Sequence, residues 1–174
     1  MNKRMLLGAL LIGASLMVTA CGSSQQPSSG SQTPPSANRG ETPEASQVEV
    51  TVYRGNQDGT AIIKEKASIS KIEDTEKKMD ALFSLLKEKG KDTAPSVPQK
   101  VQLNSAALAG GVLTLDVSQD VQSMSSTEEL MFLKALPATV FDNFPDVTTI
   151  KFTINGEAAE ALSQTDVSKG INRP

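Results

Sequence analysis

The sequence predicts an α+β fold: a single small domain with a mixed or antiparallel sheet of about five or six strands and two helices packed on it, preceded by a disordered tether. Three observations predict it. Several stretches alternate apolar and polar residues, two others repeat apolar residues at helical spacing, and turns rich in Gly or Pro separate them. The residues from 47 to 174 are numerous enough for one domain whose core needs no disulfide.

The N-terminus has the layout of a secretory signal peptide. Lys3 and Arg4 give a short positive region, and Met5 to Val18 carry no charge. This apolar stretch is shorter than the roughly 20 residues that cross a bilayer core, which disfavours a lasting transmembrane helix. We therefore expect residues 1–20 to be a lipoprotein signal peptide.

The four residues Val18, Thr19, Ala20 and Cys21 resemble the bacterial lipobox, whose cysteine becomes the new N-terminus. Cys21 is the only cysteine, so an intrachain disulfide is excluded. The resemblance implies a thioether-linked diacylglycerol on Cys21, and two acyl chains anchor a protein stably in the lipid bilayer. The expected location is the extracytoplasmic face of the cell membrane. The alternative is a soluble secreted protein with an incidental cysteine.

Residues 21–46 are rich in Ser, Gln, Pro and Gly. So few apolar residues cannot offset the entropy of ordering, and the segment is therefore predicted to be a disordered tether. At about 25 residues it would span on the order of 25 to 30 Å.

The domain is expected to begin with a hairpin and a helix. Val48, Val50 and Val52 alternate with polar residues, which is typical of a half-buried strand, and residues 60–67 suggest a return strand. A helix follows, capped by Asp74 or Thr75. Its apolar residues fall at i, i+3, i+4 and i+7, namely Met79, Leu82, Phe83 and Leu86.

Two further strands are expected at residues 101–104 and 113–117, joined by a turn at Gly110-Gly111. Ser126 at the N-cap and Glu129 at N3 then fit a capping box that starts a second helix. Pro137 lies inside that helix, where it removes a backbone hydrogen bond. The sequence therefore predicts a kink or an end near residues 133–136.

The strand pattern is clearest at residues 149–154, and Asn155-Gly156 is a strong hairpin signal after it. No regular element is predicted for the C-terminal tail.

Residue types limit the chemistry. The chain has no histidine, no tryptophan and no thiol beyond Cys21. This excludes Ser-His-Asp and Cys-His sites and the usual zinc sites, so we expect no enzyme activity, no cofactor and no metal. Asp116 and Asp120 could form a metal or acid–base pair, but an aspartate at a strand end more often accepts from nearby backbone donors. Glu128 and Glu129 are expected to serve the helix start.

The charge balance limits the partners. Without Lys3 and Arg4 the exported part has 15 basic and 20 acidic residues, a net charge of −5. This acidic balance argues against nucleic acid as a partner.

Several short sequence segments, in their order and spacing, resemble those of the GerMN-domain family, a module of spore-germination and sporulation lipoproteins. The matching segments are residues 50–53 with the Asp58-Gly59 turn, residues 111–118, residues 147–156, and the ending at residues 166–168 with Arg173-Pro174. The resemblance is to a single-domain relative of GerM, which carries two such domains. It implies an α+β sandwich-like module that binds envelope proteins or peptidoglycan in a spore former, without a catalytic site.

The resemblance names no ligand-binding residues and no oligomeric state. An alternative function stays open: a small-ligand-binding or wall-hydrolysing envelope lipoprotein unrelated to spores. A glycan hydrolase would need two carboxylates converging in one cleft, roughly 5 to 9.5 Å apart.

Overall fold

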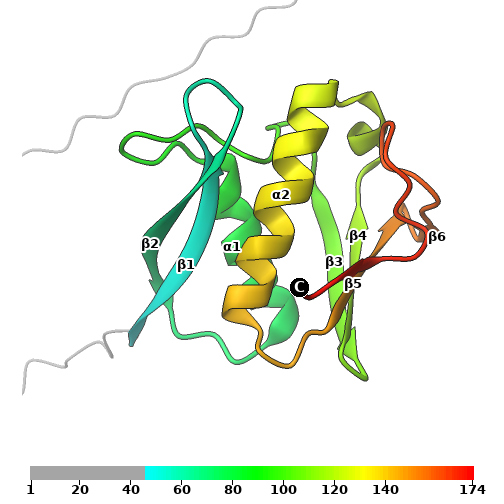
Figure 1. The fold of residues 1–174 in the computed structure, drawn as a ribbon. Coiled ribbons are helices and arrows are strands. Elements are labelled where there is room, and N and C mark those ends of the chain that lie inside the picture. The colour runs from blue at the N-terminus through cyan, green and yellow to red at the C-terminus, as the bar shows by residue number, and fades with distance from the viewer. Residues whose placement is uncertain (1–45) are drawn as a thin grey trace, which may run out of the picture. The chain divides into compact units, whose positions relative to one another are not determined.

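The computed structural model describes residues 46–174. The predicted signal peptide, the lipobox with Cys21, and the tether up to residue 45 lie outside the described residues. The predicted α+β class is confirmed (Figure 1). The elements are β1 (Gln47–Gly55), β2 (Ile62–Ser70), α1 (Thr75–Lys87), β3 (Leu103–Ala109), β4 (Val112–Val117), a short 3-10 helix η1 (Gln119–Ser123), α2 (Ser126–Asn143), β5 (Thr149–Ile154), β6 (Glu157–Ala158) and β7 (Ile171–Asn172).

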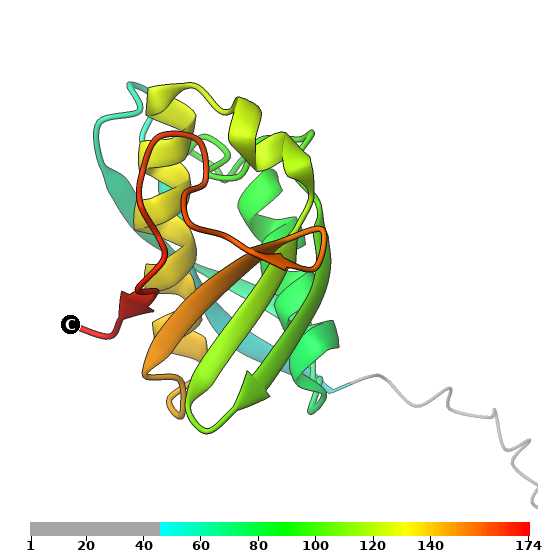
Figure 2. The same ribbon diagram turned by 90° about the vertical axis from the view of Figure 1, so that its right-hand side faces the viewer.

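The strands form two sheets rather than one. β1 and β2 make an antiparallel hairpin, and the second sheet has the order β3-β4-β5-β6, with β7 also pairing with β5. Among the strands of residues 46–174, only β4 and β5 are parallel, with Leu115 opposite Phe152. In Figure 1 the hairpin lies on one side of the two helices and β3 to β5 on the other, and Figure 2 shows the larger sheet in front of both helices. The domain therefore has three layers.

The parallel pair explains the position of α2. Parallel strands need a crossover connection, and η1 with α2 provides it between β4 and β5. Because α2 lies between the two sheets, residues on most of its sides are buried, among them Met131, Phe132, Leu136 and Val140.

The core centres on Phe132 of α2, which is fully buried. Its ring meets that of Phe83 from α1 edge-on at 6.5 Å and that of Phe152 from β5 at 6.0 Å. Around these rings, Leu113 and Leu115 of β4 and the apolar stripe of α1 are also buried. The predicted stripe at Met79, Leu82, Phe83 and Leu86 is thus confirmed.

The helix starts agree with the prediction for α1 and differ for α2. Asp74 caps α1, its carboxylate accepting from the Lys77 N–H at 2.9 Å. The capping box of α2 lies one residue earlier than predicted. Ser125 is the N-cap and Glu128 is N3, and Glu128 Oε2 accepts from the Ser125 N–H at 2.8 Å. The predicted roles of Ser126 and Glu129 were therefore wrong.

Pro137 does not end α2, which continues to Asn143. Of the two predicted outcomes near residues 133–136, a kink or an end of the helix, the end was wrong. Leu136, Pro137 and Val140 are all buried, so packing between the two sheets compensates for the backbone hydrogen bond that proline removes.

Both predicted turns are present, since Gly110, Gly111, Asn155 and Gly156 all have positive φ. The tail is more regular than predicted, because its strand β7 pairs with β5 through Ile150 and Ile171.

Candidate functional site

Asp116 lies near the end of β4, and its carboxylate is fully engaged by neighbouring donors. Oδ1 accepts from the Thr153 hydroxyl and the Gly156 N–H, both at 2.7 Å, and Oδ2 accepts from the Asn104 amide at 2.9 Å. Partial burial raises the pKa of Asp116, but these hydrogen bonds outweigh it, and the pKa lies below its ordinary value. The carboxylate therefore joins β3, β4 and the turn after β5.

Asp120 has different neighbours from Asp116, since it accepts a hydrogen bond from the Ser118 hydroxyl at 3.0 Å. Within the described part of the chain, the two carboxylates share no hydrogen-bond partner. Among residues 46–174 no group of three or more His, Cys, Asp or Glu side chains could hold a metal ion.

Glu129, predicted to cap α2, is instead a buried carboxylate with 3% of its surface exposed. Its Oε1 accepts three backbone N–H groups, from Ser163 and Gln164 at 2.9 Å and from Thr165 at 3.0 Å. Desolvation raises the pKa of Glu129, but the three N–H donors outweigh it and lower the pKa below its usual range. Glu129 thereby anchors the loop after β6 to α2.

That loop forms one wall of a hollow with a volume of about 560 Å³. The opposite wall is η1. Side chains with amide or carboxylate groups line much of the hollow, namely Gln119, Gln122, Asn155, Glu157 and Glu160. No Lys or Arg is among the lining residues. The hollow can therefore donate hydrogen bonds from its amides and accept them at amides and carboxylates.

A second groove, of about 340 Å³, is more apolar. It lies between the β1–β2 turn, the segment before β3 and the first turn of α2. Its lining includes Gly55, Pro95, Val97, Pro98 and Met131.

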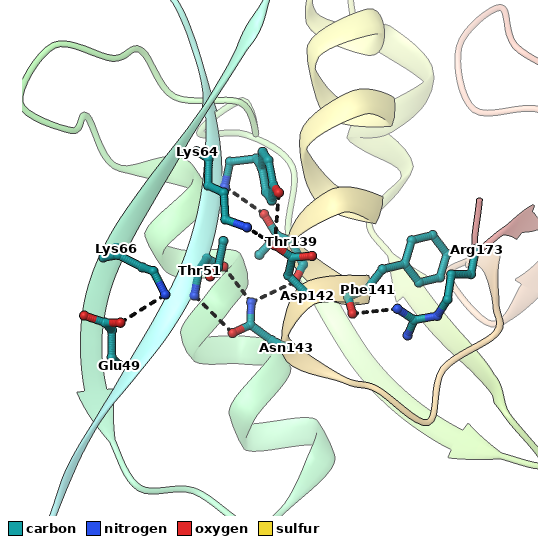
Figure 3. A network of polar contacts seen from close by, with 10 residues as sticks. Glu49, Thr51, Lys64, Lys66, Thr139, Phe141, Asp142, Asn143 and Arg173 are labelled. Carbon is teal, nitrogen blue, oxygen red and sulfur yellow. Dashed lines mark hydrogen bonds and ion pairs between the residues drawn. The ribbon is translucent and has the colours of Figure 1, made fainter.

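Other well-connected polar residues hold the fold together. The guanidinium of Arg173 donates to the carbonyl oxygens of Phe141, Phe144 and Val147 at 2.6 to 2.9 Å and lies 4.9 Å from the Phe141 ring centre (Figure 3). Arg173 thus satisfies the last carbonyls of α2.

Arg54 has the same role at the end of α1. This residue is 5% exposed, donates twice to the Leu85 carbonyl and forms an ion pair with Glu65 at 2.6 Å. A side chain at Gly90 would meet the Glu65 carboxylate and the Thr93 hydroxyl, so a larger residue there would displace the acidic partner of Arg54.

A third cluster joins the hairpin to α2 (Figure 3). Asp142 accepts from Lys64 at 2.8 Å and from the Tyr53 hydroxyl at 3.0 Å. The hydrogen bond from Lys64 is the main reason why the pKa of Asp142 lies below its ordinary value. Beside it, Lys66 pairs with Glu49 at 3.0 Å.

Comparison with known proteins identifies the domain. A family model described as "Germane: Sporulation and spore germination" matches residues 51–160, more than half of the chain. The chain belongs to the Germane family. This membership confirms the resemblance inferred from sequence and associates the chain with sporulation and spore germination.

Two solved structures share the Germane fold of this chain. One is the tandem GerMN domains of the sporulation protein GerM from Bacillus subtilis, at 16% identity and a TM-score of 0.61, covering 74% of this chain and 47% of that one. The other is the first GerMN domain of GerM, at 15% identity and a TM-score of 0.61, covering 72% of this chain and 98% of that one. This chain therefore spans about half the length of the tandem-domain protein.

No curated protein sequence matches the chain. Within residues 46–174, no helix is both long and apolar enough to cross a membrane.

The segment that matches the Germane model contains most of the residues that line the hollow, among them Gln119, Gln122, Asn155 and Glu157. Sequence reasoning did not assign these residues to a site, because Gln119, Gln122 and Glu157 belong to no local motif and Asn155 was identified only as part of a turn. It also missed the buried Arg54, although Arg54 continues the alternation of Val50 and Val52 and could have been recognised as facing inward.

Proposed function

We propose that this Germane-family chain is a membrane-anchored extracytoplasmic lipoprotein whose domain binds envelope proteins or wall material in sporulation or spore germination, without catalysing a reaction. The observation that carries the proposal is the family match over residues 51–160. It is supported by the lipobox-like residues that end at Cys21. Lipid on Cys21 would hold the domain at the membrane, with the segment before β1 as its tether.

The polar hollow between η1 and the loop after β6 is the surface we assign to the ligand. Its volume of about 560 Å³ falls within the roughly 300 to 1,000 Å³ of ligand sites. Wall glycan and its peptides offer hydroxyl and amide groups, which pair with the side chains of Gln119, Gln122 and Asn155. Glu157 and Glu160 favour a ligand that donates hydrogen bonds or carries an ammonium group.

The state of Asp116 and Glu129 makes these two carboxylates unsuited to act as a general acid. A general acid in a glycosidase needs a raised pKa, whereas the pKa values of Asp116 and Glu129 are lowered. Both carboxylates also have their oxygens occupied by donors within the fold.

A pull-down on purified cell wall and on solubilised membranes tests the proposal. The probe is the intact chain, compared with the double variant Gln119→Ala/Gln122→Ala. Both side chains line the hollow and are exposed, so the fold should tolerate their removal. We expect the double variant to recover at least about tenfold less partner, which corresponds to the loss of roughly two hydrogen bonds.

Gln57→Ala is the matched control, since Gln57 lines the second groove instead of the hollow. It should recover the partner as well as the unmodified chain does. If Gln57→Ala abolished recovery and the double variant did not, the second groove would be the binding surface and the assignment of the hollow would be wrong.

A further inference from the structure

The two sheets have four outer edges, and the edge of β1 is sealed within the domain. The outward N–H groups of Thr51 and Tyr53 donate to the side chains of Asn143 and Thr139 at 3.2 and 3.0 Å. Further along, the Gly55 N–H donates to the Ala94 carbonyl at 3.1 Å. Side chains of α2 and the segment before β3 therefore take the place of a neighbouring strand.

The edge of the larger sheet beyond β5 is also covered. β6 pairs with β5 through Thr153 and Ile154, and β7 pairs with it through Thr149 and Ile150. Both covering strands have two residues, and very short edge strands are a common way to prevent pairing with another chain.

The third edge, along β2, is open but charged. Among residues 46–174 β2 has no strand partner other than β1. It carries Lys64, Glu65 and Lys66 in sequence, and the two lysine side chains are more than half exposed. Antiparallel pairing of β2 with its own copy about any of these three residues would place like charges opposite each other, which is destabilising. These charges therefore disfavour pairing of β2 with β2 of a second copy of the chain.

The fourth edge, along β3, is open and has no such protection. Within the described residues β3 pairs only with β4. The sequence has no charged residue from Val101 to Leu115, and β3 itself reads Leu-Asn-Ser-Ala-Ala-Leu-Ala. Asn104, Ser105 and Ala107 are exposed. The alternate N–H and C=O groups of β3 that point away from β4 are thus available to a further strand.

We propose that β3 pairs antiparallel with β3 of a second copy of this chain, joining the two five-stranded sheets into one continuous sheet. A two-fold axis near Ala106 or Ala107 would place small, neutral side chains opposite each other, so neither charge nor bulk opposes the pairing. On the inner face, Leu108 of each copy would extend the apolar layer of the other. Figure 2 shows β3 at the margin of the sheet, with the helices behind it.

A segment from the N-terminal part of the same chain is a poorer occupant of this edge. Residues 22–45 contain Pro27, Pro34, Pro35 and Pro43, and proline cannot donate to a strand ladder. A second copy of β3 contains no proline. A pair of seven-residue strands buries a small area, so we expect a weak, concentration-dependent dimer.

Cysteine cross-linking tests the proposal in the purified full chain in solution. Because Cys21 is the only cysteine, a Cys21→Ser background leaves one thiol when Ala107→Cys is added. A short bis-maleimide should then give a covalent dimer of two copies. Ser68→Cys, an exposed position on the β2 edge, is the matched control and should stay monomeric. Equal cross-linking at both positions, or a cross-link from residue 107 only to another protein, would overturn the proposal.

A charge-swap experiment keeps the test independent of the cross-linker. Ala107→Lys places two ammonium groups opposite each other at the axis and should weaken self-association at least about fivefold in sedimentation velocity of the detergent-solubilised chain. Mixing it with Ala107→Glu should restore the dimer, which a loss of folding would not allow. An unmodified chain that stays monomeric at every concentration would contradict the proposal.

Discussion

The side-chain amide of Asn143 forms two hydrogen bonds with the backbone of Thr51, 92 residues earlier in the chain. Its Oδ1 accepts from the Thr51 N–H at 3.2 Å, and its Nδ2 donates to the Thr51 carbonyl at 2.6 Å (Figure 3). An amide side chain at the end of a helix thus replaces a peptide group of a neighbouring strand. This relationship holds the hairpin against α2 and leads to the first prediction.

Asn143→Ala should destabilise the domain by about 1 to 3 kcal/mol, because it leaves two backbone groups of Thr51 without partners. Urea unfolding of the chain measures this loss. Lys134→Ala, at an exposed position of α2, should change the free energy of unfolding by less than about 0.5 kcal/mol. Equal effects of the two substitutions would show that the Asn143 bonds contribute nothing to stability.

Glu129→Gln should destabilise the domain by about 1 to 3 kcal/mol and flatten its pH dependence. The loss of the negative charge weakens the bonds from the N–H groups of the loop at residues 163–165. Because the folded-state pKa of Glu129 is lowered, its stabilising contribution is complete above the unfolded pKa of about 4.3 and is lost as the pH falls through the folded value.

Urea unfolding of the unmodified chain and of Glu129→Gln across acidic pH checks this sign. The stability difference between them should shrink as the pH falls below about 4.3. A difference that grew on acidification would mean that Glu129 is protonated in the folded state.

Arg173→Lys should loosen the C-terminal turn of α2. Lysine keeps the charge but cannot donate at once to Phe141, Phe144 and Val147, because it lacks the planar fork of the guanidinium. We expect faster hydrogen exchange at the amides of residues 140–144 and a loss of about 1 to 3 kcal/mol in stability. Lys169→Ala, at an exposed position of the same tail, should leave these amides unchanged.

Cys21→Ala should move the chain from the membrane fraction to the soluble fraction and abolish labelling by a fatty-acid probe, if Cys21 is the anchor. Ser23→Ala, two residues later, is the matched control and should stay membrane-bound and labelled. Retention of Cys21→Ala in the membrane with its label intact would contradict lipid attachment at this residue.

The sequence predicted the elements well because each depends on a local pattern. The alternation at Val48, Val50 and Val52 and the glycine turn at 110–111 needed no knowledge of distant residues. The division of the strands into two sheets could not be predicted in this way, because it depends on both helices packing between the sheets. The same limit applies to β7 and Arg173, whose partners lie more than 20 residues away.

The capping box of α2 shows why the sequence could not locate the start of this helix to a single residue. Both Ser125 with Glu128 and Ser126 with Glu129 satisfy the Ser-x-x-Glu pattern, and nothing local separates them. The contact of Glu129 with the loop at residues 163–165 decides between them. The polar hollow depends on that same loop, so its residues could not be identified before the fold was known.

Site-specific photocrosslinking asks whether the polar hollow binds a partner in the cell. A photoreactive amino acid at Gln122, inside the hollow, is compared in intact cells with one at Gln57, on the second groove. The proposed function predicts that position 122 captures an envelope protein or a wall fragment, and that position 57 does not. Capture at position 57 alone, or breakdown of wall material by the purified chain, would contradict a non-enzymatic domain that binds through the hollow.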